Sequence, residues 1–298
     1  MIPSLKDWKT RGKKISIHNH SLFVVDEGTS TETIVILHGY PTCSYDYYAV
    51  LPILTQKYRV VVHDHLGFGL SEKPLDYSYS LLEQADMAIG LWQQLGLQKV
   101  HLLAHDYGTS VATEIVARAN RGIEPVKLDT ITIGNGSMLI EMAKLQAAQK
   151  VLRSKRWGPV LAKLSNHWFF NRSMKKLWYD KAKYNPQEIE VIWEMMNEDP
   201  QWRKTFPAVS RYLLERVKFW HRWIGKGLYQ TPKHINILWA DKDPVAIIKM
   251  GETLHKNIPS NSFKVLPNIG HYPMLEEPEV YANAVIEMIE ARQNKSGE

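Results

Sequence analysis

The sequence predicts an α/β fold, with a mostly parallel eight-stranded sheet, helices on both of its faces and one inserted helical segment. Two observations predict it. Strand and helix patterns alternate in both the first and the last part of the chain, and residues 136–231 between these parts differ from them in composition. With 298 residues, 44% of them hydrophobic, the chain is long enough for such a domain and its core.

Short apolar runs rich in β-branched residues mark the expected strands. The first two are expected to be antiparallel, and the later ones alternate with helices. A helix is expected over residues 81–95, where apolar side chains recur at helical spacing before Gly96. Further helices should follow Asp106, begin near Ala246 and begin at Pro278. The expected strands are residues 14–17, 22–25, 33–37, 58–63, 100–104, 128–133, 235–239 and 262–266.

The central segment has its own charge and aromatic content. Between Met138 and Thr231 there are 18 Lys and Arg against 8 Asp and Glu, with 7 of the 10 tryptophans. We therefore predict a core of residues 1–135 and 232–298 that carries a helical cap of residues 136–231. Basic residues among tryptophans would suit a weak contact with an anionic membrane. Cap tryptophans more often line a pocket, so we expect a small apolar or aromatic substrate and no nucleic acid.

Other features bear on compartment and cofactors. The single cysteine, Cys43, cannot form an internal disulfide, and neither a signal peptide nor a membrane-spanning stretch is recognisable. A soluble cytoplasmic protein, monomeric or homodimeric, is the expectation. His63 and His65 flank an aspartate without further ligands nearby, and residues 67–69 form a lone Gly-x-Gly, so we predict no metal and no cofactor.

Asp106 is the most informative residue, because it follows the strand 100–104 and precedes a helix. Ala104 and Gly108 are the small residues that a sharp strand-to-helix turn needs two positions before and after its centre. A serine in that position attacks acyl carbonyls. An aspartate instead attacks a saturated carbon that carries a leaving group and becomes an alkyl ester. Epoxides and alkyl halides are therefore the expected substrates.

Two further candidate residues follow the last two expected strands. Ligands of a parallel sheet bind at the carboxyl ends of its strands, so these residues are expected at the site. His271 is the candidate base that activates water to hydrolyse the ester. Asp243 is the candidate that orients the imidazole, with Asp241 as its competitor and Asn135 as a more distant alternative. The order nucleophile, acid, histidine is the one expected for this kind of sheet.

The loop after the strand 33–37 is expected to complete the site. The backbone N–H groups of Tyr40 and Tyr107 are candidates for an oxyanion hole, which would stabilise the charge that develops as water attacks the ester. Pro41 is a candidate for a cis peptide that aims this loop.

Five short segments of the chain are similar in sequence and order to those of a known superfamily: HGYP, DHLGFGLSEKP, AHDYG, ADKDP and NIGHYP. The chain resembles the aspartate-nucleophile branch of the α/β-hydrolase superfamily, which includes epoxide hydrolases and haloalkane dehalogenases. The resemblance implies the α/β-hydrolase fold with a cap. Dehalogenases of this kind typically hold the halide with a Trp after the nucleophile and often an Asn after His-Gly, where this chain has Tyr107 and Tyr40. Fluoroacetate dehalogenases bind their carboxylate with an arginine soon after the nucleophile, where this chain has Thr109 and Ser110.

The resemblance also implies acids in the cap, since epoxide hydrolases protonate the opening ring with cap tyrosines. Tyr212 resembles the second of these tyrosines. The first has no clear match, and His167, Tyr179 and Tyr184 are the candidates. The leading prediction is an epoxide hydrolase that forms a vicinal diol. A haloalkane or haloacid dehalogenase is the alternative, and a non-catalytic lipid- or protein-binding protein of the same fold is the alternative from another class.

Overall fold

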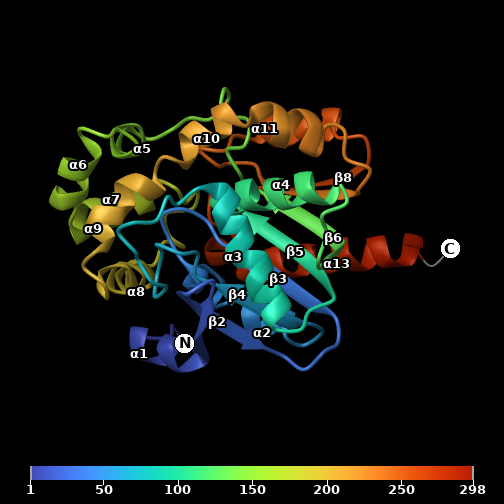
Figure 1. Ribbon diagram of the computed structural model, residues 1–298, viewed down its shortest axis with the longest axis horizontal. Coiled ribbons are helices and arrows are strands. Elements are labelled where there is room, and N and C mark those ends of the chain that lie inside the picture. Colours follow the sequence, from blue (N-terminus) through green and yellow to red (C-terminus); the bar gives the residue numbers. More distant parts are fainter. Residues whose placement is uncertain (1, 297–298) are drawn as a thin grey trace.

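The computed structural model describes residues 2–296, which form a central sheet surrounded by helices (Figure 1). The strands are β1 (Gly12–Ile17), β2 (His20–Glu27), β3 (Thr33–Leu37), β4 (Arg59–His63), β5 (Lys99–His105), β6 (Lys127–Gly134), β7 (Ile235–Ala240) and β8 (Asn261–Leu266). They lie in the order β1-β2-β4-β3-β5-β6-β7-β8. β2 pairs antiparallel with β1 and β4, and all other neighbours are parallel. The predicted mostly parallel eight-stranded sheet is confirmed.

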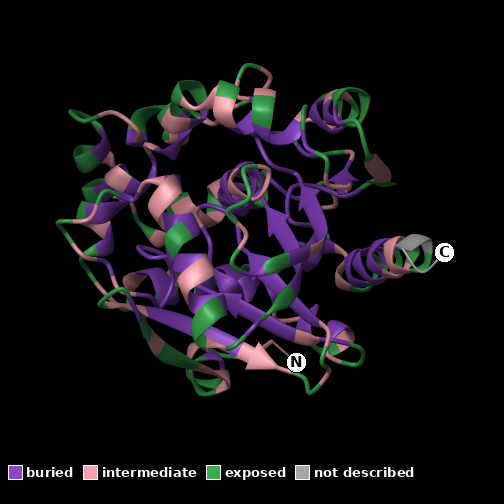
Figure 2. Ribbon diagram, turned by 45° about the vertical axis from the view of Figure 1, so that its right-hand side comes forward, coloured by how far each residue is buried: buried purple, intermediate pink, exposed green. Residues whose placement is uncertain are grey.

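Alternate residues of the central strands enter two separate cores, one on each face of the sheet. In β3, Val35 and Leu37 pack on one face, and Ile34 and Ile36 pack on the other. Figure 2 shows the central strands buried along their length. Helices cover both faces, as predicted. The first face carries α3 (Leu81–Gln94), α4 (Tyr107–Ala119) and α11 (Ile248–Asn257), and the second carries α2 (Leu51–Leu54) and α13 (Pro278–Ser296).

The observed boundaries lie within two residues of the predicted ones. Helix α11 shows the largest shift at a helix start, because it begins at Ile248 and not near Ala246. The N–H groups of Val245 and Ala246 donate to the carboxylate of Asp243 over 2.7 and 3.0 Å. These two residues therefore wrap around Asp243, and the helix starts after them.

Helix α13 is the longest in the structure, at 19 residues, and it packs along α2 and the strands β6, β7 and β8. Neither α13 nor any other helix within residues 2–296 combines the length and the apolar character needed to cross a bilayer. The parts of the chain before and after residues 136–231 also contain three short helical elements: α1 (Leu5–Arg11), a 3₁₀ turn (Ser44–Tyr47) and α12 (Pro273–Glu276).

Residues 136–231, here called the insert, leave the sheet after β6 and return to it at β7. Its helices are α5 (Ala147–Leu152), α6 (Gly158–Leu164), α7 (His167–Lys175), α8 (Pro186–Asn197), α9 (Trp202–Val209), α10 (Tyr212–Lys218) and a π-helical stretch (His221–Leu228). Figure 1 places α5 to α9 together on the side away from the C-terminus. The π-helical stretch instead packs on α4, where Arg222 and Trp223 donate to Glu114, each over 2.7 Å.

Candidate active site

Asp106 occupies a strained turn between β5 and α4. Its φ of 44° and ψ of −109° lie outside the regions that residues with a side chain usually adopt. Glycines make room for the turn: a Cβ on Gly108 would lie 2.1 Å from the carbonyl oxygen of Leu37, and one on Gly39 would lie 3.1 Å from the Cβ of Asp106. Backbone strain of this kind gathers at functional sites, where it holds a side chain in one orientation.

The Asp106 carboxylate is buried and accepts a hydrogen bond from the backbone. The N–H of Tyr40 donates to Oδ1 of Asp106 over 2.8 Å. The peptide between Tyr40 and Pro41 is cis, in agreement with the sequence-based expectation. Tyr107 is the first residue of α4, so its N–H belongs to the helix turn that lacks intrahelical acceptors. Both predicted oxyanion-hole residues therefore adjoin the carboxylate.

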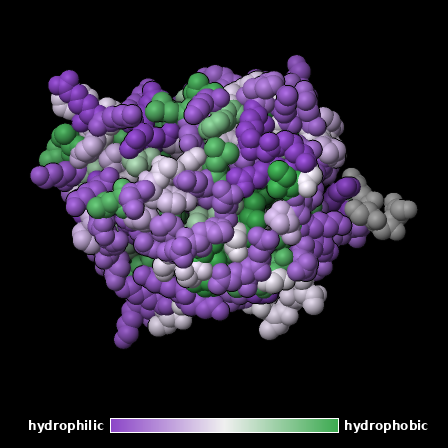
Figure 3. Space-filling view, in the orientation of Figure 1, coloured by the Kyte–Doolittle hydropathy of each residue, from purple (hydrophilic) through white to green (hydrophobic). Residues whose placement is uncertain are grey.

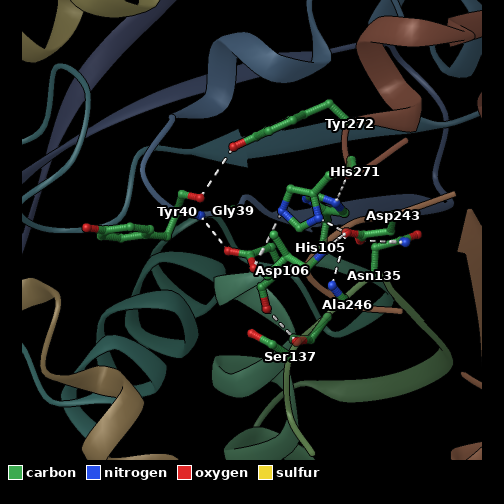
Figure 4. A network of polar contacts seen from close by, with 12 residues as sticks. Gly39, Tyr40, His105, Asp106, Asn135, Ser137, Asp243, Ala246, His271 and Tyr272 are labelled. Carbon is green, nitrogen blue, oxygen red and sulfur yellow. Dashed lines mark hydrogen bonds and ion pairs between the residues drawn. The ribbon is translucent and has the colours of Figure 1, made fainter. Parts of the chain in front are cut away.

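His271 lies between two carboxylates (Figure 4). Its Nδ1–H donates to Oδ2 of Asp243 over 2.6 Å, and its Nε2 lies 3.7 Å from Oδ2 of Asp106. The three side chains come from the turn after β5 and from the loops after β7 and β8. The structure thus brings together the three residues that were predicted from their order in the sequence.

Asp243 is held firmly on the side away from His271. Its Oδ1 accepts the N–H groups of Val245 and Ala246, and its Oδ2 also accepts an N–H from Asn135 over 2.9 Å. Asn135 in turn bridges both backbone groups of Ala240, so it fixes the carboxyl end of β7. It acts on Asp243 and not on the imidazole.

Asp241, the competing candidate, faces elsewhere. It accepts the backbone N–H of Asn268 over 2.6 Å and pairs with Lys242 over 3.0 Å. These contacts tie together the two loops that follow β7 and β8. The structure therefore favours Asp243 as the partner of His271.

The protonation of His271 follows from its surroundings. Burial alone would lower the pKa of the imidazole, but the carboxylates of Asp243 and Asp106 outweigh burial and raise the pKa to about 9. At neutral pH the free protein therefore holds an imidazolium between two carboxylates. Loss of the negative charge on Asp106 would remove part of this stabilisation and lower the pKa of His271 again.

His105 is a buried residue at the site whose role was not predicted. Its Nε2–H donates to the carbonyl oxygen of His271 over 2.8 Å, and burial lowers the pKa of His105 to about 4. The ring is therefore neutral and anchors the loop that carries His271. The available signal was its position directly before Asp106, at the carboxyl end of β5.

Arg216 is a second residue that the sequence reasoning missed. It is 2% exposed, and none of the carboxylates that the structure describes forms an ion pair with it. Its guanidinium donates to Oγ of Ser110 over 2.7 Å, to the carbonyl oxygen of Ser137 over 3.1 Å and to the carbonyl oxygen of Asp106 over 3.4 Å. Arg216 therefore joins α10 to the turn at Asp106. Helical spacing from Tyr212, four residues earlier, was the signal that places it on the buried face.

A cavity of about 360 Å³ lies between the insert and the sheet. It reaches Tyr40, Pro41 and His271, and two of these contact Asp106. The rest of its wall is mainly apolar and comes from the insert, including Leu152, Leu161, Phe170, Met196, Trp202 and Phe206.

Tyr212, the expected cap acid, is buried behind Tyr40 and is not itself among the residues that line the cavity. Its ring centroid lies 5.4 Å from that of Tyr40 and 4.9 Å from that of Tyr107, and the Arg216 guanidinium lies 4.6 Å from it. The Tyr212 hydroxyl has no hydrogen-bond partner among residues 2–296. Burial, with a smaller contribution from Asp106, raises the pKa of this phenol well above its usual value. The hydroxyl is thus protonated and its hydrogen-bonding capacity is unused.

The three candidates for a second acid lie away from the cavity wall. Tyr179 is exposed on the surface under Lys242. Tyr184 is buried, but its hydroxyl donates to Asn171 over 2.7 Å and so supports the insert. His167 begins α7 and lines a separate surface hollow. The structure brings none of them to Asp106, because sequence proximity within the insert does not determine which face of each helix meets the core.

One cluster of possible metal ligands exists among the described residues, at the opposite end of the sheet. The ligand atoms of Glu32, His101 and Asp129 lie within 4.8 Å of one another. The ammonium of Lys99 lies 3.2 Å from both carboxylates and balances their charge. This cluster therefore forms an ion-pair network at the amino ends of the strands, remote in the fold from Asp106.

The fold and the site define an α/β hydrolase. The family described as "alpha/beta hydrolase fold" matches residues 32–278, so the chain belongs to this family. Among curated relatives, the chain is 37% identical over 287 residues to "Putative hydrolase LipZ" of Mycobacterium tuberculosis, covering 96% of this chain and 98% of that protein. It is 31% identical over 297 residues to the mesoderm-specific transcript protein of Mus musculus, covering 96% and 88%.

Solved structures share the fold at lower identity. The epoxide hydrolase CorEH superimposes with a TM-score of 0.75 at 17% identity and covers 93% of this chain and 97% of its own. The haloalkane dehalogenase DbeA of Bradyrhizobium elkani superimposes with a TM-score of 0.79 at 19% identity, covering 95% and 99%. The predicted resemblance to this superfamily is confirmed, and family membership supports a hydrolase.

Proposed function

We propose that this hydrolase opens epoxides through an ester on Asp106. The observation that carries the proposal is the placement of a buried carboxylate on a strained turn, with the Tyr40 N–H on one oxygen and His271 near the other. A serine is absent from that position, so the nucleophile is a carboxylate. Carboxylates displace leaving groups from saturated carbon.

In the first step, an oxygen of Asp106 attacks an epoxide carbon. The bond from that carbon to the epoxide oxygen breaks, and the oxygen takes a proton from the Tyr212 hydroxyl. Arg216, which lies over the Tyr212 ring, stabilises the phenolate that remains. The products of this step are an alkyl ester on Asp106 and a hydroxyl on the neighbouring carbon.

In the second step, water attacks the carboxyl carbon of the ester. Once the ester has formed, Asp106 no longer carries a charge, so the pKa of His271 falls. The imidazolium then releases its Nε2 proton to solvent, and the neutral imidazole can take a proton from the attacking water. The oxyanion that develops is stabilised by the backbone N–H groups of Tyr40 and Tyr107. Collapse of this intermediate releases the diol, whose oxygen takes that proton from His271. The Asp106 carboxyl group then passes its remaining proton to His271, and the Tyr212 phenolate recovers its proton from solvent.

The insert is proposed to act as the cap over this site. The cavity between insert and sheet is walled mainly by apolar and aromatic side chains, which favours an apolar or aromatic substrate. The opened epoxide oxygen stays attached to the substrate and needs only a proton. A departing halide needs several N–H donors. At the two positions where a halide-binding Trp and Asn would be expected, this chain has Tyr107 and Tyr40. Dehalogenation is therefore the second candidate.

Trapping of the ester tests the proposal. His271→Gln should leave Asp106 able to attack but should block hydrolysis, so the ester accumulates and intact-protein mass spectrometry detects it. A panel of epoxides and haloalkanes distinguishes the candidates. An added mass equal to the whole epoxide supports the proposal, and an added mass equal to the substrate without halide supports dehalogenation.

Two controls complete this experiment. Asp106→Ser in the His271→Gln background should abolish the adduct, because the attacking carboxylate is gone. Asp241→Asn in the same background should leave it unchanged, because Asp241 faces the loop at Asn268. No adduct across the whole panel would contradict both enzymatic candidates and favour a binding protein of this fold.

A further inference from the structure

Large apolar side chains gather at the surface of the insert. Val151, Trp157, Val160, Leu164, Trp168 and Phe169 are all exposed, and they lie within one short run of the chain on α5, α6, the loops beside them and α7. These six residues are here called the apolar patch. Trp157, Val160 and Leu164 recur at helical spacing, so they share the outer side of α6. Large exposed apolar side chains gathered in one part of a surface are typical of an interaction site.

The apolar patch lies within an unusually basic stretch. Residues 142–179 contain nine Lys and Arg and neither Asp nor Glu. None of these nine cations forms a salt bridge with a carboxylate described by the structure. Arg156 and Arg172 instead lie over the exposed rings of Trp157 and Trp168, at 5.3 and 5.4 Å from the ring centroids. The stretch therefore presents uncompensated positive charge around apolar side chains.

The surface can be followed in the figures. Figure 1 places α5, α6 and α7 on the side away from the C-terminus. In the same orientation, Figure 3 shows hydrophobic side chains standing among hydrophilic ones along that side. The mixture of the two kinds of side chain is the one expected for a helix that lies in the plane of a membrane interface.

The apolar patch is continuous with the cavity of the candidate site. Leu164 and Phe169 are 66% and 58% exposed, and both also line the cavity. On α6, Leu161 points into the cavity while Val160 lies outside. The cavity that reaches His271 therefore opens within the patch. A molecule that enters the cavity from the side of the apolar patch would contact Leu164 and Phe169 first.

The charge and the side chains select one occupant. A second copy docked through the same face would place nine cations against nine cations. A nucleic acid would match the charge but not the exposed leucine and valines. An anionic bilayer matches both, because its headgroups attract Lys and Arg and its interface accepts tryptophan and aliphatic side chains.

We propose that α5, α6 and α7 dock on an anionic lipid bilayer, and that the substrate is an apolar molecule dissolved in that bilayer which enters the cavity past Leu164 and Phe169. The second half rests on the proposed function, whereas the docking does not. Docking is peripheral: the basic side chains lie on the headgroups, and the apolar patch is buried at the level of the upper acyl chains.

Vesicle co-sedimentation tests the docking without any turnover. The full chain is mixed with phosphatidylcholine vesicles, with or without phosphatidylglycerol, at low and high salt. Two variants probe the surface: Trp157→Ser with Val160→Ser and Trp168→Ser, and Lys155→Glu with Arg156→Glu. The control for the first variant is Val265→Ser with Val280→Ser, on β8 and α13. The control for the second is Lys13→Glu with Lys14→Glu, on β1.

The proposal predicts binding to the anionic vesicles that weakens with salt and falls at least tenfold in both surface variants but not in the controls. Equal binding to both kinds of vesicle, no binding, or binding unaffected by either surface variant would overturn it. Binding of duplex DNA that is lost in the two surface variants, together with no binding to vesicles, would assign the surface to nucleic acid instead.

The substrate half has its own readout. The two surface variants should hydrolyse a water-soluble epoxide as the wild type does, yet lose at least tenfold in rate on a long-chain epoxide carried in anionic vesicles. Equal loss on both substrates, or on neither, would overturn the substrate half. If Asp106→Ser binds vesicles normally and no epoxide is hydrolysed by the wild type, the proposed function fails while the docking stands.

Discussion

Nε2 of His271 lies 3.7 Å from Oδ2 of Asp106, too far for a hydrogen bond and close enough for strong electrostatic attraction. The same ring donates to Asp243 over 2.6 Å. The Asp243 carboxylate therefore holds the imidazole in place, and the carboxylates of Asp243 and Asp106 together raise its pKa. Formation of the proposed ester on Asp106 would lower the pKa of His271 while leaving its hydrogen-bond partner Asp243 in place, which couples the two steps of the proposed reaction.

Asp243→Asn should impair hydrolysis of the ester and leave its formation nearly intact. An amide can still accept the N–H groups of Val245 and Ala246 but cannot stabilise the imidazolium. We expect the hydrolytic step to slow by on the order of 10³ to 10⁴-fold. Rapid-quench mass spectrometry should then show the ester accumulating. Asp241→Asn is the control, and a similar loss in that variant would contradict the assignment of Asp243.

Folding stability should depend on His271 at alkaline pH. The pKa of His271 is raised from 6.5 to about 9 in the folded state, so its contribution is complete below about pH 6.5 and is lost as the pH rises through 9. A shift of this size corresponds to about 3 kcal/mol at most. Urea denaturation between these pH values should show the fall, and His271→Gln should flatten it. A wild-type stability that is constant over the range would contradict the shift.

Tyr212→Phe should separate stability from activity. The Tyr212 hydroxyl has no partner among the described residues, so removal of a buried unsatisfied group should leave the free energy of unfolding unchanged or increase it. Formation of the ester should slow by about 10² to 10⁴-fold. Stopped-flow fluorescence and urea denaturation measure the two effects.

Tyr184→Phe is the matched control for Tyr212→Phe. The Tyr184 hydroxyl donates to Asn171 within the insert, so its loss should lower stability by about 1 kcal/mol and leave the rate unchanged. The assignment of Tyr212 as the acid would be wrong if the two variants reacted equally fast.

Two glycines should differ in what an added methyl group does. Alanine at Gly108 would meet the carbonyl oxygen of Leu37 at 2.1 Å, so α4 and β3 must separate, at about 3 kcal/mol and with loss of activity. Gly96 has a φ of +71° with open space around it, so Gly96→Ala should lower stability by only about 1 kcal/mol and keep activity. Thermal denaturation and a rate assay on both variants check this, and equal effects would contradict the role of the turn.

The sheet and the three residues Asp106, Asp243 and His271 could be predicted from the sequence, whereas the contacts made by the insert could not. Strands such as β3 are short buried runs whose signal is local, and the positions of Asp106, Asp243 and His271 follow from where such strands end. The contacts of Arg216 and the placing of Tyr184 depend on which helix face meets the core. That is decided by packing between segments far apart in the chain, and composition alone does not encode it.

The central claim is that the Asp106 carboxylate, and not water, attacks the substrate. A single turnover in H₂¹⁸O with enzyme in excess over an epoxide tests it most directly. The account predicts that the diol from this first turnover carries no label and that the label enters the Asp106 carboxylate, as peptide mass spectrometry would show. Label in the first-turnover diol with an unlabelled Asp106 would contradict it.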